Sequence, residues 1–216
     1  NWHDDEEKAQ NVADFVRKAG RQAQLTKGDV SKVADCRKIV ADTVAAFGTI
    51  DILINNAGMF PRVKFLEMKE TDFDFVMDIN LKGTFFCSQA AAREMVKSGT
   101  KGTIVNLASQ SVRGQTPLAT HYTTSKLGIV GITRATAHEL AEHGIRVNAV
   151  APGLTDTAQP RYGNTEDELT VMGSNVPLGR MMSPEEIAYT AVFLCSEKSA
   201  MTTGQVFHVN GGSYLG

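Results

Sequence analysis

The sequence predicts an α/β domain built around a mostly parallel sheet, with helices on both faces. Short, continuously apolar runs recur along the chain, at 50–54, 103–108, 145–151 and 205–209. Their length and lack of alternation are typical of strands buried on both faces. Amphipathic helical patterns separate these runs, and this alternation favours a doubly wound parallel sheet. Right-handed crossovers would then distribute the helices over both faces.

Composition indicates one globular domain over residues 1–216. The chain is 42% hydrophobic, and its 22 basic and 24 acidic residues give a net charge of −2. This balance gives no electrostatic reason to expect nucleic acid or an anionic membrane as a partner. The three cysteines, Cys36, Cys87 and Cys195, are far apart and outside any Cys-x-x-Cys spacing. We therefore expect free thiols in a reducing, cytoplasmic compartment and no metal site.

The first third of the chain contains two helical patterns. An apolar stripe over 6–19, closed by Gly20, predicts the first helix. Residues 24–29 are predicted as a short strand. Ser31 is predicted to cap a second helix, which stops at Gly48.

The middle of the chain alternates strands and helices. The run at 50–54 predicts a buried strand that ends in the turn Asn55–Gly58. A long helical pattern follows over 71–98, then a strand at 103–108 and a polar loop. The next helical pattern begins at His121 and continues to about 143.

After the strand at 145–151, the pattern becomes irregular from 154 to 182, where proline and glycine recur. The stretch Ser183–Glu186 is a capping box with proline at the first helical position, so we expect a helix from there to about Cys195. A last strand is expected at 205–209.

Tyr122 and Lys126 stand four residues apart, so a helix places both on one face. A nearby ammonium favours the phenolate and would lower the tyrosine pKa from about 10. Such a tyrosine can act as an acid/base catalyst, although the same spacing occurs by chance on many surface helices.

Polar residues gather where the predicted strands end, and the Tyr122 helix directly follows one of these ends. Ligands bind parallel α/β sheets at this edge, outside the carboxyl ends of the strands. The residues concerned are Asp29, Asn55, Asn56, Ser109, Gln110, Ser111, Pro152, Gly153, Thr155 and Thr157.

These motifs, in this order, resemble the short-chain dehydrogenase/reductase family. The resemblance runs from about Asp29 to the C-terminus. It comprises Asp29-Val30, Asn55-Asn56-Ala57-Gly58, Asn80, Ser109 thirteen residues before Tyr122, Tyr122-x-x-x-Lys126, and Arg146-Val147-Asn148 with the segment 152–157. The resemblance implies a Rossmann-like fold and hydride transfer between NAD or NADP and a secondary alcohol or ketone.

The resemblance also implies roles for individual residues. Tyr122 would exchange the proton, Ser109 would donate a hydrogen bond to the same oxygen, and Lys126 would hold the nicotinamide ribose and keep the Tyr122 pKa low. Asn80 would anchor a water that passes protons to Lys126. The implied cofactor-binding residues are Asp29, Val30, Asn56, Ala57, Gly58, Tyr122, Lys126, Pro152, Gly153, Thr155 and Thr157.

One family feature is missing from this chain. Members open with a strand, a glycine-rich turn and a helix that receive the cofactor pyrophosphate, and no such fingerprint precedes Asp29. We therefore expect the chain to be an N-terminally incomplete form. The choice between NAD and NADP stays open, because Asn1 stands where the family usually places an acid.

The segment 154–182 corresponds to the family's substrate lid. Its polar residues favour a polar substrate such as a sugar or a 3-oxoacyl thioester. His121, Gln110 and Arg113 are interpreted as loop polar groups rather than pocket residues. The resemblance implies a homotetramer. The alternative is a non-catalytic binding or scaffold protein of the same fold. A site that had lost its catalytic function would be expected to lack at least one of the four catalytic residues, Asn80, Ser109, Tyr122 and Lys126.

Overall fold

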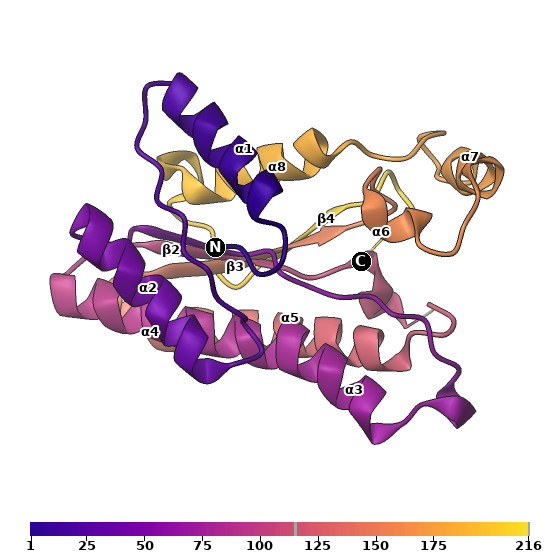
Figure 1. The fold of residues 1–216 in the computed structure, drawn as a ribbon, viewed down its shortest axis with the longest axis horizontal. Helices are drawn as coiled ribbons and strands as arrows, with labels where there is room; N and C mark the ends of the chain where they lie inside the picture. Colours follow the sequence, from indigo (N-terminus) through magenta and orange to yellow (C-terminus); the bar gives the residue numbers. More distant parts are fainter. Residues whose placement is uncertain (115, 216) are drawn as a thin grey trace.

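The protein is a four-stranded parallel sheet with helices on both faces, as the sequence predicts (Figure 1). The computed structural model describes residues 1–114 and 116–215. The strands are β1 (Ile52–Asn55), β2 (Thr103–Leu107), β3 (Arg146–Pro152) and β4 (Val206–Val209), in the spatial order β1-β2-β3-β4. Each neighbouring pair is parallel, so all the carboxyl ends lie at one edge.

Helices cover the two faces in separate layers. Figure 1 shows α2, α4 and α5 on one face and α1 and α8 on the other, with α6 and α7 beyond the carboxyl ends of the strands. The helices are α1 (Glu6–Lys18), α2 (Val33–Phe47), α3 (Glu70–Val76), α4 (Gly83–Ser98), α5 (Thr120–Leu140), α6 (Ala158–Arg161), α7 (Glu166–Ser174) and α8 (Pro184–Cys195).

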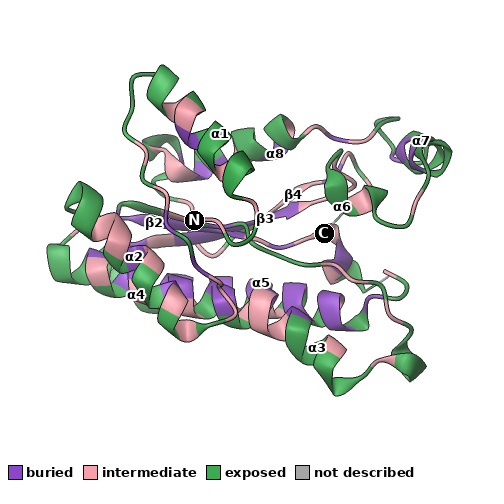
Figure 2. Cartoon of the chain, in the orientation of Figure 1, coloured by how far each residue is buried: buried purple, intermediate pink, exposed green. Residues whose placement is uncertain are grey.

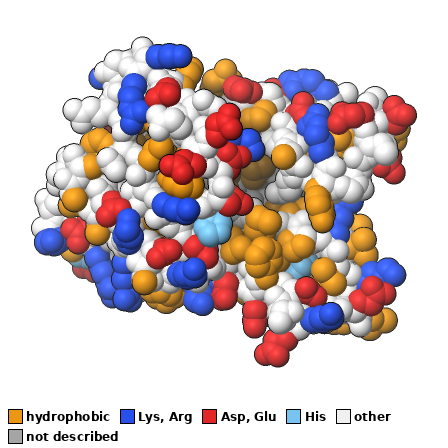
Figure 3. All heavy atoms as spheres, in the orientation of Figure 1, with side chains coloured by type: hydrophobic (Ala, Val, Ile, Leu, Met, Phe, Trp, Pro, Cys, Tyr) orange, Lys and Arg blue, Asp and Glu red, His pale blue; other side chains and the backbone are white. Residues whose placement is uncertain are grey.

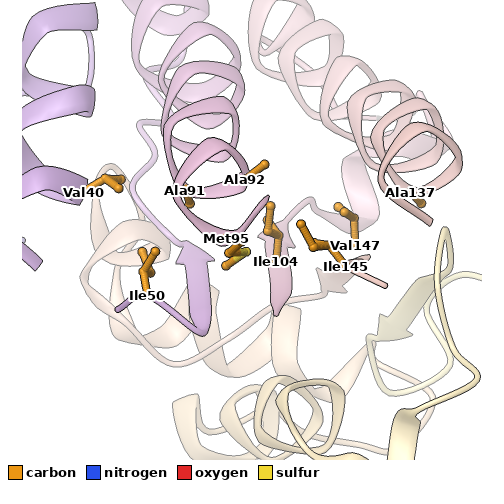
Figure 4. Packing of buried hydrophobic residues seen from close by; sticks show 9 residues of the cluster. All are labelled: Val40, Ile50, Ala91, Ala92, Met95, Ile104, Ala137, Ile145 and Val147. Carbon is orange, nitrogen blue, oxygen red and sulfur yellow. The ribbon is translucent and has the colours of Figure 1, made fainter. Parts of the chain in front are cut away.

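The core lies between the sheet and the α4–α5 layer. Nine buried residues from α2, α4, α5 and the strands form its largest cluster (Figure 4). Ile104 and Val147, on adjacent strands, are fully buried, and Met95 of α4 packs with them. The central strands β2 and β3 are buried almost throughout (Figure 2), which is the burial expected of parallel strands covered on both faces. The edge strand β1 instead leaves Ile52 47% and Ile54 45% exposed, so the prediction of a buried strand at 50–54 is wrong in its burial. β4, at the other edge, is half-buried.

Several helix boundaries follow the sequence signals. Gly48 ends α2 in the left-handed conformation, with φ of 83°, a conformation that only glycine adopts readily. Ser183 caps α8 through a reciprocal capping box with Glu186. Ser31, however, is not the cap of α2, and that prediction is wrong. Its hydroxyl donates to the Asp29 carboxylate at 2.7 Å, and Lys32 occupies the cap position.

The strand predicted over residues 24–29 is also wrong. This segment makes one isolated bridge, between Lys27 and Trp2. The Trp2 N–H donates to the Thr26 carbonyl, and the Trp2 carbonyl accepts from the Gly28 N–H. A strand requires pairing along its length, and here the neighbouring segment turns away into α1 after a single bridge.

The long helical pattern at 71–98 is interrupted. A single wide turn, Met77–Lys82, separates α3 from α4, and Asn80 lies within it. Such π-type turns insert an extra residue into the helix and frequently mark functional sites. The segment at 154–182 contains two helices, α6 and α7, rather than irregular chain alone.

Candidate active site

A cavity of about 550 Å³ opens at the carboxyl ends of β2 and β3. Its walls come from the loops that follow β1, β2 and β3, from the start of α5 and from the segment 154–172. In Figure 3, charged side chains of both signs are scattered over the visible face, while apolar side chains gather near its middle. Parallel α/β sheets bind their ligands at this edge, so the cavity is the candidate active site.

Ser109, Tyr122 and Lys126 all line this cavity. Ser109 follows β2 directly, and Tyr122 and Lys126 lie on the first two turns of α5. Tyr122 is 7% exposed, and the edge of its ring meets Phe60 with the ring centroids 4.4 Å apart. The structure therefore brings together three residues that the sequence separates by up to seventeen positions.

Lys126 is buried and points back to the sheet. Its ammonium donates to the carbonyl oxygen of Leu107 at 2.6 Å and lies 5.5 Å from the Tyr122 ring centroid. Burial lowers the pKa of Lys126 to about 8, because the charged form loses its hydration. An ammonium has three donors, so this single backbone contact leaves donors for a ligand.

Burial raises the pKa of Tyr122 above its ordinary value. The Ser109 and Gln159 side chains oppose this rise, because both can donate a hydrogen bond to a phenolate. Lys126 is not among the groups that shift the Tyr122 pKa, so the lowering expected from it does not occur in this structure. Desolvation of a phenol that is almost completely covered by protein is the larger effect.

Asn80 lies behind the cavity and does not line it. Its amide nitrogen donates to the Met59 carbonyl at 3.0 Å and to the Ser125 hydroxyl at 3.1 Å, while its amide oxygen accepts from the Met59 N–H at 2.8 Å. Asn80 is fully buried. These contacts join the loop after β1 to the helix that carries Tyr122, so the Asn80 side chain positions the site.

Most of the expected cofactor residues reach the cavity. Its lining includes Asn56, Gly58, Pro152, Gly153, Thr155 and Thr157. Asp29, Val30 and Ala57 are not among the described lining residues. Asp29 instead accepts hydrogen bonds from Ser31, and Val30 packs against the start of α4 at Gly83.

The Lys126 ammonium beside Gly58 lines the cavity and has donors that match the ribose hydroxyls of a dinucleotide. A Cβ added at Gly58 would lie 3.4 Å from the Asn80 amide oxygen and 3.5 Å from the Lys126 ammonium nitrogen. These are ordinary contact distances, and Gly58 and Lys126 line the cavity side by side. Lys126 would hold the ribose hydroxyls there, and the backbone around Thr155 would orient the nicotinamide ring.

The sequence reasoning missed several cavity residues. Phe60 and Arg62 line the cavity from the loop after β1, where Arg62 lies beside Asn164 of the 154–172 segment. Leu118 lines the cavity from the loop before α5. Leu118 has a φ of 58°, which is strained for a branched side chain. The position of Phe60 and Arg62 just after a strand's carboxyl end was the available signal.

Gln110 lines the cavity, so its interpretation as a loop group outside the pocket is wrong, whereas His121 and Arg113 do not line it. Arg113 donates to the Ser213 carbonyl at 2.7 Å, and His121 is fully buried. Within residues 1–114 and 116–215, no group of three or more His, Cys, Asp or Glu side chains is arranged to hold a metal ion. None of the helices in the described part of the chain has both the length and the apolar character needed to span a bilayer.

Comparison with known proteins places the chain in a family. Residues 2–214 match a family model described as enoyl-(acyl carrier protein) reductase. The chain is 35% identical to the 3-oxoacyl-[acyl-carrier-protein] reductase FabG of Staphylococcus epidermidis over 217 residues, covering all of this chain and 87% of the relative. It is 38% identical to an uncharacterized oxidoreductase of Thermotoga maritima, covering 96% and 84% of the two chains.

A solved structure agrees with these relatives. The crystal structure of a putative short-chain alcohol dehydrogenase from Sinorhizobium meliloti superimposes with a TM-score of 0.90 at 38% identity, over 95% of this chain and 82% of that one. The chain belongs to the short-chain dehydrogenase/reductase family. It is an NAD(P)-dependent oxidoreductase that acts on CH–OH and C=O groups.

Proposed function

We propose that Tyr122 is the general acid/base of this oxidoreductase and that the reaction interconverts a secondary alcohol and a ketone. The observation that carries the proposal is the convergence of Ser109, Tyr122 and Lys126 on one cavity at the carboxyl ends of the strands. When bound, NAD or NADP supplies the hydride donor or acceptor.

The residues of the chain handle the proton and the developing charge. In reduction, Tyr122 donates its phenolic proton to the oxygen of the substrate carbonyl, and in oxidation it removes the proton from the hydroxyl. Ser109 donates a hydrogen bond to the same oxygen, where negative charge develops. Lys126 holds the cofactor ribose and places a positive charge beside the phenol. Asn80 anchors a water that passes protons to Lys126.

The cofactor-binding set comprises Asp29, Val30, Asn56, Ala57, Gly58, Tyr122, Lys126, Pro152, Gly153, Thr155 and Thr157. Eight members of this set line the cavity, and this supports the proposal. They are Tyr122 and Lys126 together with Asn56, Gly58, Pro152, Gly153, Thr155 and Thr157. Either NAD or NADP fits the proposal.

The substrate is a polar hydroxyl or carbonyl compound of small size, such as a sugar or a 3-oxoacyl compound. Gln110, Gln159 and Asn164 line the cavity and can hydrogen-bond to polar substrate groups. The segment 154–182 acts as the substrate lid, because residues from Leu154 to Met172 line the cavity and α6 and α7 lie beyond the carboxyl ends of the strands (Figure 1).

We further propose a cytoplasmic homotetramer. Apolar side chains that are unusually exposed for an isolated protein lie on α4 and α5, at Phe85 and Leu127, and on α8, at Tyr189 and Val192. Light scattering of the purified protein measures the assembly directly.

The function is tested by measuring turnover of sugars, aromatic alcohols and 3-oxoacyl esters as substrates. The change in nicotinamide absorbance reports turnover, and each substrate is assayed with the NAD and the NADP cofactor. The proposal expects turnover of polar members and at least a 100-fold loss in Tyr122→Phe. Turnover in Tyr122→Phe equal to the parent's contradicts the role of Tyr122. Activity on apolar ketones alone contradicts the substrate class.

A further inference from the structure

We propose that the substrate carries a carboxylate and that Arg62 binds it. This inference rests on the proposed function, because it assigns the part of the substrate that lies away from the reacting carbon. Arg62 follows β1 by seven residues and lies outside the motifs that the sequence analysis singled out.

The charge of the cavity favours an anion. Among its described lining residues, Arg62 and Lys126 are the only charged side chains, and both are cationic. Lys126 is directed at the Leu107 carbonyl beside Tyr122, whereas Arg62 lies on the outer wall. A pocket lined by two cations and no described acid attracts a negatively charged ligand.

Arg62 has hydrogen-bonding capacity to spare. Among the described residues, its side chain makes one hydrogen bond, a long one of 3.4 Å from Nη1 to the amide oxygen of Asn164 in the lid. Within the described chain, no carboxylate lies close enough to Arg62 to form an ion pair. A guanidinium offers five N–H donors in a planar fork that matches a carboxylate.

Glu168, an acid whose charge interacts with that of Arg62, is already engaged. Glu168 accepts hydrogen bonds from the Thr165 N–H at 2.7 Å and from the Thr165 hydroxyl at 3.2 Å, in the capping box of α7. These bonds hold the pKa of Glu168 below its ordinary value, and the charge of Arg62 adds a smaller contribution. Glu168 therefore stabilises the lid helix and leaves the guanidinium available.

The backbone that carries Arg62 is fixed in place. The N–H of Val63 donates to the Leu118 carbonyl at 2.8 Å, which ties this loop to the loop before α5. The Arg62 guanidinium carbon also lies 5.8 Å from the Phe60 ring centroid. The strained Leu118 thus helps to hold the cation at a constant place on the wall.

The distances set the length of the substrate. The Phe60 ring centroid lies 5.8 Å from the guanidinium carbon of Arg62 and 4.4 Å from the Tyr122 ring centroid. The cation is therefore at most about 10 Å from the catalytic ring, a span that a short carbon chain bridges. The ligand class is a compact hydroxy or oxo acid, such as a sugar acid or a short 3-hydroxy acid.

The test compares matched substrate pairs with the full-length protein. Each pair is an acid and its uncharged counterpart, such as an aldonic acid with its aldose, or a 3-hydroxy acid with its amide. Steady-state kcat/KM is measured for the parent, Arg62→Met and a control, Lys64→Met. Lys64 is a suitable control because it lies on the same loop, is exposed, and already pairs with Glu67 at 3.1 Å.

We expect the parent to prefer the acid of a pair, and Arg62→Met to lose about 10- to 100-fold in kcat/KM on the acid. The loss should lie mainly in KM, with the uncharged counterpart changed less than twofold and Lys64→Met unchanged on both. Equal effects of Arg62→Met on acid and uncharged substrates would overturn the inference while leaving the proposed function standing. A parent preference for phosphate monoesters over acids would overturn the carboxylate assignment. Absence of hydride transfer with either class would instead contradict the proposed function.

Discussion

Lys126 reaches from α5 to the backbone of Leu107, where its ammonium donates to the carbonyl oxygen at 2.6 Å. Leu107 is the last residue of β2, and Ser109 follows it by two positions. This contact ties the helix that carries Tyr122 to the strand end that carries Ser109. The cation that serves the site therefore also fixes the relative position of its two hydroxyl groups.

Replacing Lys126 with methionine should stabilise the protein near neutral pH. The pKa of Lys126 falls from 10.5 to about 8 on folding, so the unfolded state binds the proton more tightly between these values. Stability then rises with pH from about 8 to 10.5, by about 3 kcal/mol. Below pH 8 the parent carries the full penalty, and Lys126→Met should be more stable there by about 2 kcal/mol once the lost hydrogen bond is counted.

Urea unfolding of both proteins at pH 7 and pH 10.5 measures this difference. The advantage of Lys126→Met should shrink at the higher pH, and its turnover should be lost. A variant that is less stable than the parent at pH 7 would show that the ammonium contributes net stability at this position.

The Tyr122 phenol should ionise above its ordinary range in the protein without cofactor. Burial raises its pKa more than Ser109 and Gln159 lower it. The ultraviolet phenolate absorbance of the parent, minus that of Tyr122→Phe, isolates this one group. The midpoint of its titration should lie above the ordinary tyrosine value of about 10. Ionisation near neutral pH would mean that Lys126 controls the phenol even without a ligand.

Asn80→Ala should destabilise the protein by about 1–3 kcal/mol. The substitution removes three hydrogen bonds and leaves the Met59 N–H and carbonyl without these partners. Asn175→Ala, at an exposed asparagine of the lid, is the matched control and should change stability by less than about 0.5 kcal/mol. The midpoints of urea unfolding are compared for the parent, Asn80→Ala and Asn175→Ala. Equal midpoints for the two variants would show that the Asn80 contacts contribute nothing to stability.

Tyr162→Phe should leave turnover within about twofold of the parent's. Tyr162 is 74% exposed and does not line the cavity among the described residues, although it belongs to the lid. Its hydroxyl therefore serves as a control for the loss expected in Tyr122→Phe. A large loss in Tyr162→Phe, measured by nicotinamide absorbance, would move part of the acid/base chemistry to the lid.

Local signals predicted much of the fold, because they do not depend on distant contacts. Gly48 ends α2 and Ser183 begins α8, as their residue types indicate. The same kind of signal, Thr165 with Glu168, caps α7, and applying the capping-box rule throughout 154–182 would have found that helix. Residues 24–29 do not form a strand, because their partner segment pairs with them at one residue only.

In the candidate site, too, residues on regular elements could be predicted from the sequence, whereas residues placed by loop packing could not. Ser109, Tyr122 and Lys126 converge because they are tied to strand ends and to one helix, which sequence order can place. Phe60 and Arg62 follow the carboxyl end of β1, which indicates the right edge of the sheet but not that their side chains line the cavity. Their position depends on how the loop after β1 packs against Tyr122 and Leu118, a long-range contact that no local pattern records.

The measurement that tests the central claim most directly is a calorimetric titration of the full-length protein with NADH and then with NADPH. The account predicts that at least one of them binds once per chain and that Lys126→Met weakens this binding at least tenfold, with Lys64→Met unchanged. Absence of binding to the folded protein, or equal binding to the Lys126→Met variant, would contradict a nicotinamide cofactor held beside Tyr122.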